Sequence, residues 1–130
     1  MLLAPMAVQW EEDEEEAVRG ALRRFPVASG RCAALARVVF KEGSRRDPST
    51  CGRHLRPRGA ARFVLPIYEP TPRWGSHTFV ETHEHAVDAL TGVEGCPAED
   101  YLVTHWRYHE VLVVTDVDPA TVDPGIQDEA

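Results

Sequence analysis

The amino-acid sequence predicts an α+β fold in which N-terminal helices pack on a small antiparallel sheet. Apolar residues recur at helical spacing in two segments before residue 42. After residue 60 the apolar segments are short and rich in β-branched and aromatic residues. Helices that come first and strands that come later, without regular alternation, are typical of α+β proteins. The 130 residues suffice for one domain with a single core.

Two helices are expected in the first third of the chain. The first runs from Glu11 to Phe25, where acidic residues begin the segment and arginines end it, as the helix dipole favours. The second runs from about Gly30 to Lys41, with Ser29 or Gly30 as the N-cap residue and Gly43 as the C′ residue.

A long loop and then most of the sheet are expected after the second helix. Residues 44–60 are rich in Arg, Gly and Pro and lack periodicity, which predicts the loop. The elements expected beyond it are strands at Arg62–Tyr68, Trp74–Glu81 and His85–Leu90, a helix at Ala98–Trp106 and a strand at Glu110–Thr115. The turn at Thr82–Glu84 pairs the second and third of these strands as an antiparallel hairpin.

The formal net charge of −7 comes from the two ends of the chain. Residues 11–16 hold six acidic residues and residues 116–130 hold five, whereas residues 17–115 hold 14 basic and 10 acidic residues. We therefore divide the chain into an acidic N-terminal segment (1–16), a folded domain (17–115) and an acidic C-terminal tail (116–130). Two readings are open: the mildly basic body binds an acidic partner, or the acidic ends fold back over the basic surface.

Several classes of protein are disfavoured by the sequence. The arginines at 45–62 lack interleaved aromatic residues, so nucleic-acid binding is not expected. No apolar run approaches the ~18 residues of a membrane span. Residues 1–8 are apolar but lack a basic region, so no export signal is expected. Three cysteines cannot all pair, which favours a reducing compartment or a domain carried elsewhere by a larger polypeptide.

Three residues have, in chain order, the chemistry of a nucleophile, a base and an orienting acid: Cys32, His77 and Asp88. Cys32 is expected in the first turn of a helix, where unpaired N–H groups and the dipole favour a thiolate and can hold an oxyanion. His77 and Asp88 are expected roughly opposite each other on the hairpin, with Cβ atoms about 5 Å apart. The structural alternative is a buried, inert cysteine beside an ordinary His–Asp pair.

Other chemistries compete with this arrangement. The alternative nucleophiles are Cys51 and Cys96. A metal site is the rival chemistry, because four histidines occur at ligand spacing: His83 and His85, His105 and His109. The HExxH motif of zinc proteases and paired CxxC motifs are absent, so we expect these histidines to be structural and expect no metal or cofactor.

Three short patches within residues 28–92 resemble the papain-like fold. They are Gly30-x-Cys32-x-x-Leu35-Ala36, Trp74-x-x-His77-x-Phe79-Val80 and Val87-Asp88-x-Leu90-Thr91-Gly92. The resemblance is to the transglutaminase-like branch and to the papain-fold toxin domains of bacterial polymorphic toxin systems. It implies a papain-like (transglutaminase-like) fold with Cys32 as nucleophile, His77 as base and Asp88 as the residue that orients the base.

The chain departs from papain-type proteases at the oxyanion hole. Those enzymes place a Gln several residues before the cysteine, whereas residues 25–27 of this chain are Phe, Pro and Val. Backbone N–H groups then suffice, or Trp74 or Ser76 takes the place of the Gln. Arg31 is expected in the same vicinity, next to the substrate.

The expected function is a cysteine-dependent acyl transfer on an amide or thioester bond. Water acting on a peptide gives a protease, water on a Gln side chain gives a deamidase, and an amine gives a transglutaminase; the sequence leaves these three open. The toxin-like resemblance implies a protein substrate, an immunity or carrier protein as partner, and action in the cytoplasm or after delivery into a target cell. The alternative from another class is a non-catalytic binding module on the same fold.

Overall fold

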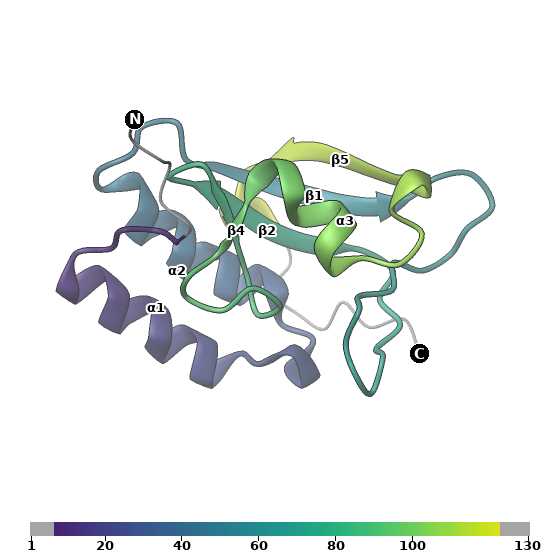
Figure 1. Cartoon of the computed structure of the whole chain (residues 1–130), viewed down its shortest axis with the longest axis horizontal. Coiled ribbons are helices and arrows are strands. Elements are labelled where there is room, and N and C mark those ends of the chain that lie inside the picture. The colour runs from purple at the N-terminus through teal and green to yellow at the C-terminus, as the bar shows by residue number, and fades with distance from the viewer. Residues whose placement is uncertain (1–6, 123–130) are drawn as a thin grey trace, which may run out of the picture.

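The computed structural model describes residues 7–122, and these residues form three α-helices and a five-stranded antiparallel sheet (Figure 1). The elements are α1 (Glu12–Arg24), α2 (Cys32–Ser44), β1 (Cys51–Pro57), β2 (His77–Thr82), β3 (His85–Val87), β4 (Cys96–Pro97), α3 (Tyr101–His105) and β5 (Leu112–Val117). The predicted α+β class is confirmed. No helix within these residues has the length and apolar character needed to cross a membrane.

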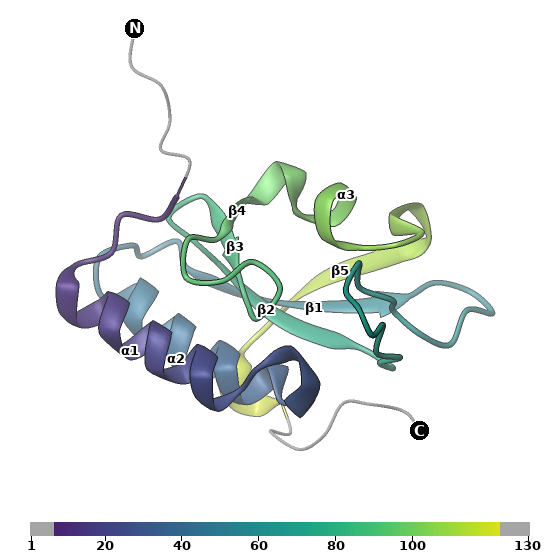
Figure 2. The same ribbon diagram turned by 60° about the horizontal axis from the view of Figure 1, so that its bottom comes forward.

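The sheet lies between two layers of helix, with α1 and α2 on one side and α3 on the other (Figure 2). Its strand order is β4-β3-β2-β1-β5. Alternation along β2 divides the core: Val80 packs with the buried residues of α1 and α2, whereas Phe79 packs with Tyr101 and Trp106 from the region of α3. Each face of the sheet is thus covered by apolar side chains.

The helix α2 begins two residues later than expected and ends beyond the predicted glycine. Arg31 is its N-cap residue, without a side-chain cap, and Gly30 before it has the left-handed φ of 64°. The expectation that Gly43 is the C′ residue is wrong, because Gly43 lies inside the helix and is buried against β2. A Cβ atom at this position would lie 2.4 Å from Thr82 Oγ1, so glycine permits the close approach of α2 to the sheet.

The expectation of a loop over residues 44–60 is wrong, because this range contains β1. This strand pairs with both β2 and β5 and occupies an interior position of the sheet. Among its seven residues only Gly52 and Leu55 are buried. Pairing with two neighbouring strands, rather than burial of its own side chains, holds β1 in place. Its sequence can therefore be charged and lack a clear apolar alternation.

The expected strand at 62–68 is also wrong, because this segment forms only isolated bridges, Val64 with Trp74 and Pro66 with Trp106. The hairpin of β2 and β3 is confirmed, with a two-residue turn in which His83 and Glu84 have positive φ values of 50° and 65°. Its strands are shorter than expected. The predicted helix at 98–106 divides into a 3₁₀ turn and α3.

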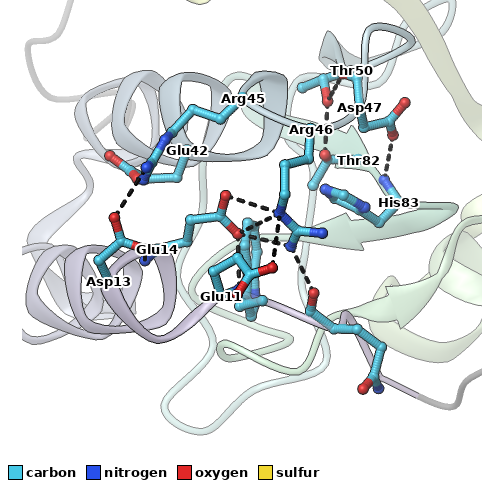
Figure 3. A network of polar contacts seen from close by, with 12 residues as sticks. Glu11, Asp13, Glu14, Glu42, Arg45, Arg46, Asp47, Thr50, Thr82 and His83 are labelled. Atoms are coloured by element: carbon cyan, nitrogen blue, oxygen red, sulfur yellow. Dashed lines mark hydrogen bonds and ion pairs between the residues drawn. The ribbon is translucent and has the colours of Figure 1, made fainter.

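The acidic residues at the start of α1 fold back over basic residues at the end of α2 (Figure 3). Glu14 is 1% exposed, and its carboxylate accepts hydrogen bonds from the Arg46 guanidinium, the shortest 2.8 Å long. The bond with Arg46 lowers the pKa of Glu14. Arg45 pairs with Asp13 and Glu42, both at 2.9 Å. The expected boundary between residues 16 and 17 therefore falls inside α1.

The described part of the C-terminal region is also held against the body. The expected boundary between residues 115 and 116 falls inside β5. A 3₁₀ turn at Pro119–Thr121 follows, and the Arg37 guanidinium of α2 donates hydrogen bonds to the carbonyls of Pro119, Ala120 and Val122. The remaining residues of the predicted tail, 123–130, lie outside the described range, as do residues 1–6 of the N-terminal segment.

Candidate active site

Cys32 is the first residue of α2, at the position predicted from the sequence. The side chain is half-buried, and its Sγ accepts a hydrogen bond of 3.2 Å from the backbone N–H of Thr78. The start of the helix is fixed by a turn in which Ser29 Oγ accepts from the N–H of Arg31. The sulfur therefore lies between a helix N-terminus and a backbone donor, both of which stabilise negative charge.

The Thr78 N–H reaches Cys32 because the sheet is incomplete at this point. The last residue of β3, Val87, pairs with Val80, so the first residues of β2 have no strand partner on that side among residues 7–122. The sulfur of Cys32 takes the place of the missing strand as hydrogen-bond acceptor. The pairing of β2 with β3 thus ends next to the candidate nucleophile, Cys32.

His77 and Asp88 form a buried pair, with Nε2 of the imidazole 2.8 Å from Oδ2 of the carboxylate. Their side chains are 1% and 2% exposed. The sequence predicted that they lie roughly opposite each other, and in the structure they are diagonal neighbours. The register of β2 and β3, continued by one residue, places Asp88 opposite Phe79. A diagonal pair of this kind is within reach of long side chains.

Asp88 is held by donors on both of its oxygens. Oδ1 accepts from the N–H groups of Leu90 and Thr91 at 2.9 and 3.0 Å, while Oδ2 accepts from Tyr101 as well as facing His77. Burial alone would raise the pKa of Asp88, but the hydrogen bond and charge of His77 and the other donors outweigh it, and the pKa is lowered. Asp88 is therefore a carboxylate with a fixed orientation.

His77 also lies beside Cys32, since both residues line one narrow pocket and Cys32 contributes to the raised pKa of the imidazole. Burial favours the neutral imidazole and so lowers the pKa. The negative charge of Cys32 and the hydrogen bond with Asp88 outweigh burial and raise the pKa from 6.5 to about 9. The structure thus brings the three predicted residues together: His77 is hydrogen-bonded to Asp88 and shares a pocket wall with Cys32.

Aromatic rings enclose the imidazole of His77. Trp74 stacks on it with ring centroids 5.2 Å apart and planes 6° apart, and Trp106 packs at 5.1 Å and 54°. Phe79 lies 6.0 Å away on the same strand. These contacts fix the plane of the ring and exclude water from the pair with Asp88.

Tyr101 is a site residue that the sequence reasoning missed. It lies on α3, is 1% exposed and donates its hydroxyl hydrogen bond to Asp88. Burial, followed by the charge of Asp88, raises its pKa well above the ordinary value, so the hydroxyl keeps its proton. The only signal in the sequence is a tyrosine in a short amphipathic helix, which ordinarily indicates packing alone.

A narrow pocket of about 10 Å³ opens beside Cys32 and His77. Its other walls come from Phe25, Pro26, Val27, Arg31, Trp74 and Ala89. Trp74 and Arg31, two of the residues expected near the substrate, therefore line this pocket, and the Arg31 side chain is exposed. Ser76 precedes His77 and is half-buried but is not part of the pocket wall. The pre-cysteine segment contributes apolar surface where papain-type proteases have a Gln.

The competing arrangements have less support in the geometry. Cys51 lies in β1 and donates to the carbonyl of Gly52, and Cys96 is buried in β4. Burial raises the pKa of both thiols. Within residues 7–122, no group of three or more His, Cys, Asp or Glu side chains has the arrangement needed to hold a metal ion.

Comparisons of the chain with protein-family models, with curated proteins and with solved structures find no match. The likeness to papain-like proteins therefore depends on the sequence patches, and the chemistry is argued from the arrangement of the side chains.

Proposed function

We propose that this chain is a papain-like cysteine enzyme that transfers the acyl group of an amide or thioester. The single observation that carries the proposal is the grouping of Cys32, His77 and Asp88, in which a buried imidazole is hydrogen-bonded to a fixed carboxylate and lies beside a helix-terminal sulfur. Nucleophile, base and orienting acid in this order are the requirement for covalent catalysis by cysteine.

The reaction follows from the protonation of His77. As an imidazolium it pairs with the thiolate of Cys32, which attacks the substrate carbonyl carbon. The C–N or C–S bond then breaks, and His77 gives its proton to the leaving amine or thiol. The acceptor, water or an amine, next loses a proton to His77 and attacks the thioester, which releases the acyl product and restores the cysteine. Asp88 keeps the imidazole in position throughout.

The oxyanion formed in each step is assigned to backbone donors at the start of α2. Cys32 is the first helical residue, so its N–H points out of the open end of the helix. Trp74 is proposed as a wall that shields the imidazole rather than as a donor, because it stacks on the ring of His77.

The acceptor distinguishes a protease, a protein glutamine deamidase and a transglutaminase, and all three remain within the proposal. The resemblance to papain-fold toxin domains supports a role as a bacterial effector that acts on a protein substrate. Such a chain works in the cytoplasm or in a target cell, with an immunity or carrier protein as a partner.

The first test is alkylation with iodoacetamide at about pH 6, where ordinary thiols react slowly. We expect Cys32 to be labelled first and stoichiometrically, with Cys51 and Cys96 as internal controls in the same molecule. Peptide mapping by mass spectrometry assigns the labelled site. Equal and slow labelling of all three cysteines would contradict the enzyme and favour a binding module.

The second test identifies the reaction. Candidate proteins are incubated with the wild-type chain or with the Cys32→Ala variant and measured by intact mass. A gain of one mass unit shows deamidation, fragments show proteolysis, and addition of a supplied amine shows transamidation. Cys51→Ser is the matched control and should retain the activity, whatever the acceptor.

A further inference from the structure

A second and larger cavity lies apart from the Cys32 pocket, between the segment that follows β1 and the segment that precedes β5. These two segments meet at the end of the sheet to which the β1 arrow points (Figure 1). The cavity has a volume of about 340 Å³, and its apolar walls include Phe63, Leu65, Val111 and Leu112. This space accommodates a large apolar side chain.

Exposed apolar side chains gather around this cavity. Five large hydrophobic residues are exposed within the described part of the chain, and two of them, Tyr108 (67%) and Val111 (38%), line it. Ile67 and Tyr68 are exposed in the segment that leads away from Leu65. That segment is bonded to the other wall, since the Arg107 N–H donates to the Leu65 carbonyl at 2.9 Å. Exposed apolar side chains at the edge of an apolar cavity indicate a contact surface for a partner.

The conformation of Tyr108 supports the same conclusion. Its φ of 53° is in the left-handed region, which is strained for a residue with a large side chain. Strain of about 1 kcal/mol is tolerated chiefly where function requires it. Here the turn directs an aromatic ring to solvent beside the cavity.

The charge around the cavity is positive although the chain as a whole has a net charge of −7. Three arginines lie at or next to its walls: Arg62, Arg73 and Arg107. Arg62 and Arg107 line it directly. The Arg73 guanidinium lies 5.1 Å from the ring centroid of Phe63.

Among the described residues, two carboxylates are recorded beside these three guanidinium groups. Glu110 lines the cavity, and Glu69 lies 3.5 Å from Arg107. The surroundings therefore attract an acidic ligand. We take the occupant to be a peptide rather than a nucleic acid, because the aliphatic walls at Leu65, Val111 and Leu112 complement an apolar side chain. An acidic peptide with a bulky apolar side chain satisfies both the walls and the charge.

This cavity and the Cys32 pocket lie on two sides of one segment. Trp74 lines the Cys32 pocket and bridges to Val64, and its neighbour Arg73 lies over Phe63 in the cavity wall. A second connection runs through Trp106, whose ring contacts His77 and whose neighbour Arg107 lines the cavity. The cavity and the Cys32 pocket are thus linked through neighbouring residues of the same two segments.

We propose that this cavity binds a bulky apolar side chain, flanked by acidic residues, on the protein substrate. The assignment of the occupant as substrate rests on the proposed function, whereas the binding itself does not. The apolar side chain fills the space between Phe63 and Val111, and the acidic residues pair with the arginines at the rim.

The test uses the Cys32→Ala protein, so that binding is measured without turnover. The probe is a capped pentapeptide, Glu-Asp-Phe-Asp-Glu, titrated into ¹⁵N-labelled protein. We expect a Kd below about 1 mM, with amide shifts concentrated at residues 58–65 and 107–112. Replacing Phe by Ala in the peptide, or its acidic residues by Lys, should abolish these shifts, and about 0.5 M salt should weaken them.

Two variants locate the site. Arg62→Glu should weaken binding of the peptide by about 3- to 30-fold, because it replaces an attraction at the rim by a repulsion. Val111→Asp should abolish it. Lys41→Glu, an exposed charge reversal on α2, is the matched control and should change it by less than about twofold. Arg62 has no side-chain partner within the described residues, so its variant tests the proposal even if Val111→Asp fails to fold.

The proposal is overturned if the peptide shifts no amide in these two segments, or if Arg62→Glu and Lys41→Glu bind it equally well. Failure of the enzyme proposal has a different signature, since slow labelling of Cys32 would leave the peptide titration unchanged. If the proposal holds, Arg62→Glu should raise KM for a protein substrate and leave the alkylation rate of Cys32 unaltered.

Discussion

Replacing Asp88 by Asn removes one charge from the centre of the site and keeps the size of the side chain. The amide oxygen of Asn can still accept from the N–H groups of Leu90 and Thr91, which lie 2.9 and 3.0 Å from Oδ1. Its NH₂ group then occupies the place of Oδ2 and donates to Nε2 of His77. A donor at this nitrogen requires the neutral imidazole, so the substitution opposes the imidazolium.

The size of the effect follows from the pKa of His77. Cys32 and Asp88 together raise this pKa from 6.5 to about 9, against burial. Two of the four interactions that raise it come from Asp88. Loss of an opposite charge in contact lowers a pKa by about 1–3 units. At a pH above the new value, kcat/KM should therefore fall by about 10- to 1,000-fold, because each unit is a factor of ten.

Two measurements check the prediction. The first is a ¹³C NMR titration of the His77 ring between about pH 5 and pH 10, which needs no substrate. The second is the pH profile of kcat/KM with a substrate from the mass screen. For the wild-type chain both should report a transition near pH 9, and for Asp88→Asn both should move to lower pH. Alkylation of Cys32 should not decline above pH 9, since it needs the thiolate alone.

The stability of the fold should also depend on the ionisation of His77. The folded pKa of His77 lies above its ordinary value, so the imidazolium contributes stability that is fully present below pH 6.5 and is lost as the pH rises through about 9. The lowered pKa of Asp88 acts at the other end, where its contribution is lost as the pH falls through the folded value. A wild-type His77 that titrates at or below 6.5, or an identical titration in Asp88→Asn, would refute the reasoning.

Three further substitutions test separate parts of the structure. Cys32→Ala should abolish activity and leave the melting temperature within about 2 °C, because the side chain is small and only half-buried; residual turnover would point to another nucleophile. Tyr101→Phe removes a donor from Asp88 and should cost about 1–3 kcal/mol of unfolding free energy in urea, with kcat reduced more than KM is changed. Glu14→Gln weakens the bond to Arg46 and should cost about 1–3 kcal/mol at neutral pH, a difference that must vanish in acid, where the wild-type carboxylate is protonated as well.

The elements that could be predicted from the sequence are those whose own residues specify both the type of element and the face that packs in the core. Both long helices have capping residues or charges at their ends and apolar residues on one side, and they formed within two or three residues of the predicted limits. The hairpin turn at residues 83–84 was also predicted from a local sequence signal. Because the candidate residues stand at the start of a helix and on this hairpin, their meeting could be predicted from the sequence.

The rest depends on contacts between distant segments. The strand β1 looks like a loop because its side chains are charged, and it exists because β2 and β5 pair with it on both sides. The segment at 62–68 has the apolar content of a strand but finds only single bridges. In the sequence, Tyr101 cannot be distinguished from an aromatic residue that only packs; its role depends on the hydrogen bond that its hydroxyl donates to Asp88. No local pattern distinguishes these cases.

The contact of Gly43 with Thr82 has a consequence for the sulfur atom at the other end of α2. Gly43 stands eleven residues after Cys32 in the same helix, which is a distance of about 16 Å along a straight rod. Because α2 packs closely on the sheet at Gly43, its N-terminal end at Cys32 cannot slide or tilt freely. The position of the Cys32 sulfur thus depends in part on the packing of Gly43 against Thr82, far from the pocket. We expect that a methyl group added at Gly43 would shift α2 and misplace the sulfur.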